Sequence, residues 1–153
     1  MKSLVVYYSR TGYTEKVAQE ISKRLNSEVE QIKDFKNRKG FLGFMISGYE
    51  AVTKKLVKIA DVEKNPKDYD LVIICSPVWA GSISSPIRTY LNNNGKNIQK
   101  VAFVATCDDN PGQIFEQMAS LSCEPIQTFS VQEKEIKQGS FIDKLGLFIN
   151  GLK

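Results

Sequence analysis

Short apolar runs typical of strands alternate along this chain with segments whose apolar residues have helical spacing. The strand-like runs cover residues 3–8, 28–32, 70–75, 101–106 and 125–131, and the helical patterns cover 15–25, 42–57, 86–91, 113–121 and 141–152. Such alternation predicts an α/β fold, in which a parallel sheet carries helices on both faces. No repeat, low-complexity tract or linker interrupts the pattern, so we expect residues 1–153 to form a single domain.

The chain contains no histidine, which excludes Ser-His-Asp and Cys-His catalysis, HExxH metalloproteases and histidine proton shuttles. The three cysteines, Cys75, Cys107 and Cys123, lie far apart and form neither a disulfide framework nor a CxxC zinc site. The longest apolar runs, 4–8 and 71–75, are too short to span a bilayer, and no signal peptide is visible. We therefore expect a cytoplasmic protein with reduced thiols, no metal site and no membrane partner.

Positive charge is concentrated between residues 33 and 58. This segment holds seven basic residues and two acidic ones, so its own net charge is +5. The whole chain has a net charge of +4, and the residues outside the segment therefore sum to −1. A solvated face is one explanation, and a docking patch for an anionic partner or substrate is another. Nucleic acid is not expected, because no recognised binding motif and no alternation of aromatic and basic residues accompanies the charge.

The loop after the first strand has the composition of a phosphate site. In open α/β sheets, ligands bind beyond the carboxyl ends of the strands, so the loops after strands one, three and four are the candidates. The first reads Ser9-Arg10-Thr11-Gly12-Tyr13-Thr14-Glu15. Hydroxyl groups and free N–H groups at a helix start suit an anion, and a glycine allows the backbone to turn those groups inward. A helix cap needs only one hydroxyl, and the Walker lysine and GxGxxG patterns are absent.

The motif Ser-x-Thr-Gly-x-Thr, placed directly after the first strand, resembles the phosphate-binding loop of flavodoxins. The resemblance implies that the cofactor is FMN. It also implies the short-chain flavodoxin fold, a three-layer sandwich around a five-stranded parallel sheet of order 2-1-3-4-5. The residues that it places around the phosphate are Ser9, Thr11, Gly12 and Thr14, with the backbone N–H groups of Arg10 and Tyr13.

The loop after the third strand contains the only tryptophan of the chain. Its Pro-Val-Trp-Ala-Gly segment resembles the loop that covers the isoalloxazine ring in flavodoxin-like proteins. The resemblance implies that Pro77, Val78, Trp79, Ala80 and Gly81 line the flavin. The alternative is that the indole is simply buried, which is the usual role of a tryptophan.

The loop after the fourth strand matches the family less closely. By the resemblance, Thr106, Cys107, Asp108 and Asp109 flank the other side of the ring, where many flavodoxins place an aromatic residue that this loop lacks. One face of the ring is then open to a substrate or a nicotinamide. The two aspartates either lower the reduction potential of the flavin by Coulomb repulsion or only cap the next helix. We expect Cys107 to be a small buried residue.

These observations favour an FMN-binding, low-potential electron-transfer carrier that serves redox partner proteins, as a monomer or weak homodimer. Such a carrier needs no catalytic residue, since the flavin supplies the chemistry. The alternative is an NAD(P)H-dependent FMN or quinone oxidoreductase, favoured by the open ring face and the basic segment, so enzymatic activity stays undecided here. A flavin-free phospho-receiver is disfavoured, because residues 8–9 and 75–76 lack the acidic side chains that it requires.

Overall fold

The computed structural model describes residues 1–153 and has a central sheet of five parallel strands in the order β2-β1-β3-β5-β6. These strands are β1 (Ser3–Tyr7), β2 (Glu28–Gln31), β3 (Leu71–Trp79), β5 (Val101–Cys107) and β6 (Pro125–Gln132). A sixth, two-residue strand, β4 (Ser82–Ile83), pairs antiparallel with the end of β3 and lies off the parallel path. The expected order 2-1-3-4-5 is therefore confirmed.

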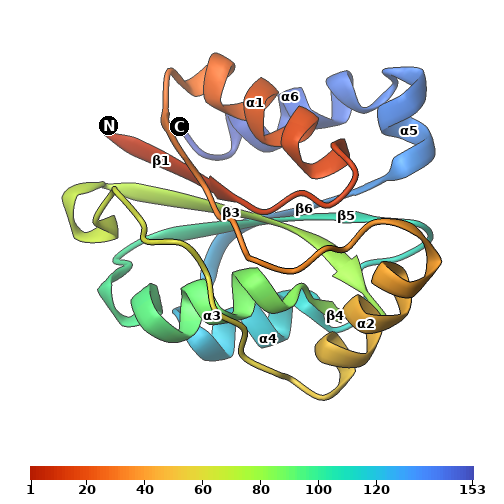
Figure 1. The fold of residues 1–153 in the computed structure, drawn as a ribbon. Helices are drawn as coiled ribbons and strands as arrows, with labels where there is room; N and C mark the ends of the chain where they lie inside the picture. The colour runs from red at the N-terminus through yellow and green to blue at the C-terminus, as the bar shows by residue number, and fades with distance from the viewer.

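Helices cover both faces of the sheet (Figure 1). One face carries α1 (Tyr13–Leu25), α5 (Glu133–Gln138) and α6 (Phe141–Asn150), and the other carries α2 (Gly40–Val52), α3 (Ser85–Asn94) and α4 (Ile114–Leu121). Two 3-10 turns, Pro66–Asp68 and Gly95–Asn97, lie in the connections. This arrangement confirms the three-layer α/β sandwich.

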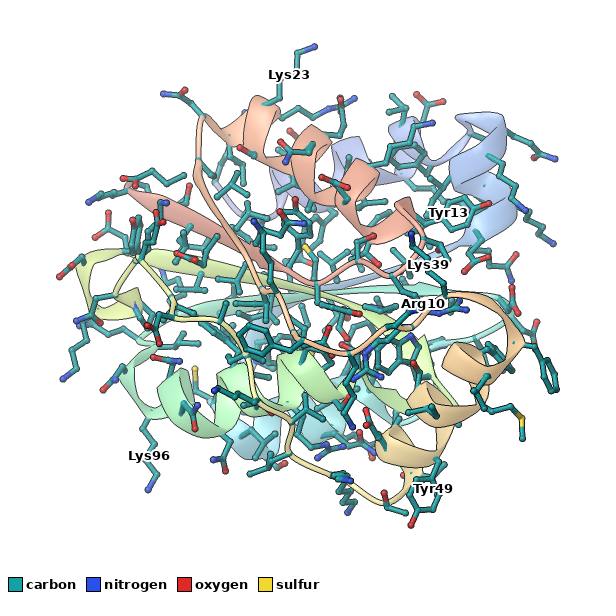
Figure 2. All side chains as sticks on the ribbon, viewed as in Figure 1. Arg10, Tyr13, Lys23, Lys39, Tyr49 and Lys96 are labelled. Atoms are coloured by element: carbon teal, nitrogen blue, oxygen red, sulfur yellow. The ribbon has the colours of Figure 1, made fainter.

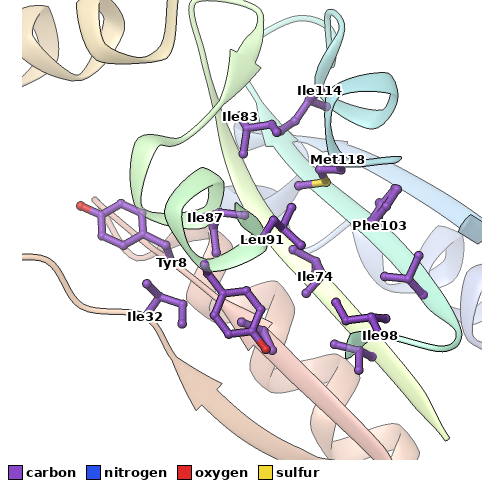
Figure 3. Close-up of a cluster of buried hydrophobic side chains, with 14 of the residues drawn as sticks. Tyr8, Ile32, Ile74, Ile83, Ile87, Leu91, Ile98, Phe103, Ile114 and Met118 are labelled. Atoms are coloured by element: carbon purple, nitrogen blue, oxygen red, sulfur yellow. The ribbon is translucent and has the colours of Figure 1, made fainter. Parts of the chain in front are cut away.

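The core consists of two apolar clusters, one on each face of the sheet. Successive residues of β3 alternate between them: Val72 and Ile74 pack on the α3 and α4 side, which Figure 3 shows in close-up, whereas Ile73 and Cys75 pack on the α1 and α6 side. A strand with helices on both faces needs apolar side chains in both directions, which explains its uninterrupted run. Burial also raises the pKa of the Cys75 thiol.

The elements differ from the sequence prediction in three main respects. Residues 76–79, expected in a loop, extend β3, because residues 76 and 77 pair with β5 and residues 78 and 79 pair with β4. The helix expected over 42–57 ends at Val52, two residues before Lys54 adopts a left-handed φ of 54°. The short helix α5 was not expected, and it begins with a reciprocal capping box between Gln132 and Glu135.

Candidate functional site

A cavity of about 740 Å³ lies at the carboxyl ends of β1, β3 and β5, beside α2. Twenty residues line it, and three separate loops contribute to it as the sheet topology predicts. Thirteen of the fifteen residues proposed from the sequence lie along this cleft: Arg10, Thr11, Tyr13, Thr14, Pro77, Val78, Trp79, Ala80, Gly81, Thr106, Cys107, Asp108 and Asp109. Their roles toward a ligand stay predictions.

Ser9 and Gly12 do not line the cleft, and they shape the first loop instead. The backbone N–H of Gly12 donates to the Ser9 Oγ across 3.0 Å, and Gly12 has a φ of 97°, which favours glycine. No side chain caps the start of α1. The first N–H groups of a helix have no partner within the helix, so those of α1 remain available to an anion.

Thr14 and Thr106 join the first loop to β5. Their Oγ1 atoms lie 2.7 Å apart, and both side chains are buried. Thr11, by contrast, is exposed at the cleft. The two threonines of the motif therefore have different surroundings, since the hydroxyl of Thr14 already has a hydrogen-bond partner within the protein.

Arg10 is the only cation among the residues that line the cleft, and its guanidinium is already engaged. Its Nε donates to the carbonyl oxygen of Arg38 across 2.8 Å, and its Nη2 donates to that of Gly40 across 3.2 Å. The guanidinium also lies 5.8 Å from the centre of the Phe44 ring. In this way Arg10 ties the first loop to the start of α2, where Figure 2 shows it near Lys39.

Trp79 lines the cleft and also belongs to the core, where it is only 9% exposed. The Arg38 guanidinium lies 4.9 Å from the centre of its ring, and the Tyr8 ring meets it edge-on at 5.5 Å. Most of the indole surface is therefore buried, which agrees with the alternative that the sequence left open. Stacking of Trp79 on a flavin stays a prediction.

Behind Trp79 lies a buried ionic cluster centred on Arg38. Its Nε donates to the Asp34 Oδ2 across 2.8 Å, and its Nη2 donates to the Glu50 Oε2 across 2.7 Å. Burial alone would lower the pKa of Arg38, but the hydrogen bonds to both carboxylates raise it overall. Burial would raise the pKa of Glu50, and hydrogen bonds from Lys36, Arg38 and Ser85 lower it overall.

This cluster shows that the basic residues of 33–58 do not all have the same surroundings. Arg38 is buried and Lys36 is paired with Glu50, so two of the seven basic residues of the segment interact within the protein. The remaining five form no salt bridge: Lys33, Lys39, Lys54, Lys55 and Lys58.

The turn between β3 and β4 is built from two left-handed residues. Ala80 has a φ of 49° and Gly81 a φ of 74°, the combination of a two-residue hairpin turn. The backbone N–H of Gln113 donates to the Gly81 carbonyl across 2.9 Å, and Gly112 packs so closely that a Cβ on it would lie 2.5 Å from that oxygen. The second and third loops therefore hold each other in place.

Carboxyl groups line the cleft beside β5. Asp108 and Asp109 lie there with Glu133 of α5, whose pKa is raised by burial and then by the charge of Asp108. Cys107 is buried, as expected, and burial raises its pKa to about 11, so its thiol is a poor nucleophile at neutral pH.

Seven cleft residues were not predicted from the sequence, and five of them come from α2. The seven are Phe44, Met45, Ser47, Gly48, Tyr49, Asn110 and Glu133. The sequence shows the helical spacing of the apolar residues of α2. Such spacing usually means that the apolar side chains pack into the core, so it gave no reason to place them in a cleft. As expected, the third loop contributes no aromatic side chain. Phe44 and Tyr49 of α2 supply aromatic groups from another direction.

Comparisons with known proteins agree with this architecture. A family model described as NADPH-dependent FMN reductase matches residues 1–130. A flavoprotein from Lactobacillus acidophilus NCFM, solved in complex with FMN, is 23% identical with a TM-score of 0.72, and the match covers 91% of this chain and 98% of that one. The two-electron reduced flavodoxin of Megasphaera elsdenii is 15% identical with a TM-score of 0.56, over 84% and 85% of the two chains. No curated protein matches the chain. The structural matches confirm the flavodoxin-like fold.

Proposed function

We propose that this chain, which belongs to the NADPH-dependent FMN reductase family, binds FMN in the cleft beside β1, β3 and β5 and acts as a low-potential electron carrier. The family assignment agrees with FMN as the cofactor, and the L. acidophilus structure of the same fold contains it. When bound, FMN supplies the electron-transfer chemistry, and the protein supplies binding, orientation and electrostatics.

The residues of the first loop fit the FMN phosphate. The start of α1 has no side-chain cap, so its N–H groups and the exposed Thr11 hydroxyl can donate to a phosphate. Gly12 provides the left-handed backbone that this turn requires. The 77–81 segment and the α2 residues Phe44 and Tyr49 offer largely apolar surface for the flat ring system.

The charges of the cleft are the observation that favours a carrier over a reductase. Arg10 is its only cation, and two of its N–H groups already donate to backbone carbonyl groups. This single, partly engaged guanidinium is therefore the only side-chain cation that the cleft offers to the phosphates of NAD(P)H. Asp108, Asp109 and Glu133 also line the cleft, and negative charge near a flavin disfavours its anionic reduced form, which lowers the reduction potential.

The second candidate is an NAD(P)H-dependent FMN or quinone reductase. The name of the family favours it, and so does the exposure of Phe44 and Tyr49, because an accessible aromatic wall beside the cofactor could receive a second planar ring. In either case, the physiological partner exchanges electrons at this cleft.

Anaerobic absorption spectroscopy of the FMN-loaded protein separates the two candidates. NADPH and then NADH are added without any reductase, followed by dithionite. For a carrier, we expect the flavin bands to persist with both nucleotides and to bleach only with dithionite. Rapid bleaching by either nucleotide would contradict the carrier proposal and establish the reductase. Free FMN at the same concentration serves as the control for direct chemical reduction.

A further inference from the structure

Helix α2 is apolar on the side that faces solvent and small or polar on the side that faces the protein. Its buried residues are Gly43, Ser47, Glu50 and Ala51. Its exposed large side chains, between 37% and 78% accessible, form what we name the outer face of α2: Phe41, Leu42, Phe44, Met45, Ile46, Tyr49 and Val52. A surface helix normally has the opposite arrangement. Figure 2 shows Tyr49 projecting outward from the lower end of this helix.

The buried ionic cluster fixes this orientation. On the inner side of α2, the Ser47 Oγ accepts a hydrogen bond of 3.0 Å from Arg38, and the Glu50 carboxylate pairs with the same guanidinium. Gly43 lies against the Arg38 backbone, where a Cβ would meet the carbonyl carbon at 2.2 Å. Rotation of α2 to bury its outer face would remove Glu50 from Arg38 and leave a buried charge without its partner, which is strongly unfavourable.

A cofactor in the cleft would leave much of the outer face uncovered. Phe44, Met45 and Tyr49 line the cleft, but Phe41, Leu42, Ile46 and Val52 do not. Phe35 before the helix and Leu56 after it are also at least half exposed. Apolar side chains scattered singly on a surface are ordinary, whereas a contiguous group of this kind marks an interaction site.

Free lysines border the outer face at both ends. Lys39 precedes the helix, and Lys54 and Lys55 follow it; none of them forms a salt bridge. The two acidic residues of the 33–58 segment, Asp34 and Glu50, are occupied by Arg38 and Lys36, with their side chains 5% and 1% exposed. The segment therefore presents apolar groups and ammonium groups to the outside, with no exposed carboxylate.

We propose that the outer face of α2 docks on an anionic lipid surface. Apolar side chains of an interfacial helix enter the boundary between headgroups and acyl chains, and flanking lysines contact acidic headgroups. None of the helices has the length and apolar character to span a bilayer, so this contact is peripheral. The expectation of no membrane partner rested on the absence of a spanning run and did not consider a surface contact.

The charges argue against a second copy of the chain on this face. Antiparallel pairing of two α2 helices would place Lys39 of one copy beside Lys54 and Lys55 of the other, and parallel pairing would place each beside its equivalent. Like charges brought together disfavour such an association. A protein partner fits less well than lipid because lysine is depleted in protein interfaces.

Sedimentation of the FMN-loaded protein with vesicles tests the proposal. We expect binding to vesicles of equimolar phosphatidylcholine and phosphatidylglycerol, weaker binding at high salt, and none to phosphatidylcholine alone. Lys54→Glu combined with Lys55→Glu should weaken binding roughly tenfold or more, since each lysine near an anionic membrane contributes on the order of 1 kcal/mol. Phe41→Ser combined with Leu42→Ser, which spares the cleft, should weaken it comparably.

Matched controls come from elsewhere on the surface. Lys23→Glu combined with Lys96→Glu changes the net charge equally at sites that Figure 2 shows far from α2, and Leu147→Ser removes an exposed apolar side chain from α6. Both should retain vesicle binding.

Absence of binding to the mixed vesicles, or equal losses in the control variants, would overturn the proposal. A lipid-free dimer in sedimentation velocity that Phe41→Ser and Leu42→Ser abolish would assign the face to a second copy instead. Neither result depends on whether the protein is a carrier or a reductase.

Discussion

The Nη2 of Arg38 lies 2.7 Å from the Oε2 of Glu50, and both side chains are almost completely buried. This pair links the segment before α2 to the inner side of that helix. The same guanidinium packs against Trp79, so one buried cation connects the helix, the preceding segment and the cleft.

We expect Glu50→Gln to destabilise the fold by about 3 kcal/mol, because the substitution leaves a buried guanidinium without one of its two carboxylates. Asp34 still pairs with Arg38, which keeps the loss at the lower end of the range for broken buried pairs. Urea denaturation followed by circular dichroism measures it. Glu124→Gln, at an exposed carboxylate without a salt bridge, is the matched control and should stay within about 0.5 kcal/mol of the wild type.

The contribution of Glu50 should also disappear in acid. The folded-state pKa of Glu50 lies below its ordinary value of 4.5. A carboxyl group of this kind stabilises the fold fully above the unfolded pKa and loses that contribution as the pH falls through the folded value. The difference in unfolding free energy between wild type and Glu50→Gln should therefore be constant near neutrality and shrink below pH 4.5. A difference that grows on acidification would contradict the assignment.

Thr11→Ala should weaken FMN binding by about 1–2 kcal/mol, the value of one hydrogen bond to a charged group, without changing stability. Titration of FMN fluorescence measures the affinity, and Thr128→Ala, an exposed threonine on β6, is the control. Thr14→Val should instead reduce stability as well, because the Thr14 hydroxyl is paired with that of Thr106. An unchanged FMN affinity in Thr11→Ala would show that the Thr11 hydroxyl does not bind the phosphate.

Gly112→Ala should lower both stability and FMN affinity. Its φ of 56° strains any other residue, and the added Cβ would lie 2.5 Å from the Gly81 oxygen, so the turn between β3 and β4 must move. We expect a loss of about 1–3 kcal/mol in unfolding free energy. Gly139→Ala is the matched control: its φ is 77°, but nothing lies within 4 Å of its Cβ position. Equal FMN affinities in the two variants would show that contact between the loops does not shape the cleft.

The sequence was sufficient to predict the centre of the sheet because burial on both faces leaves continuous apolar runs in β1, β3 and β5. The run 71–75 is apolar without interruption, and Ile73 and Ile74 indeed pack in opposite clusters. The site could be located for a related reason. The carboxyl ends of parallel strands meet at one edge, so loops distant in sequence had to converge there.

The extension of β3 through Trp79 could not be predicted, because proline, glycine and serine after residue 75 indicate a turn, and only pairing with β4 and β5 makes the segment a strand. The orientation of α2 could not be predicted either. Helical spacing identifies the helix, but the side that faces the protein is determined by hydrogen bonds from Arg38. Arg38 lies outside the helix, so the spacing of the helical residues does not reveal this interaction.

The inverted helix also has an evolutionary consequence. The inner side of α2 is constrained by Arg38 and by the close approach at Gly43, whereas its outer face contributes little to holding the fold together. Mutations can therefore accumulate on the outer face without a penalty in folding. Related proteins could keep the same scaffold and cofactor cleft while the residues of that face outside the cleft diverge, so that the surface on which the protein acts evolves separately from the redox centre it serves.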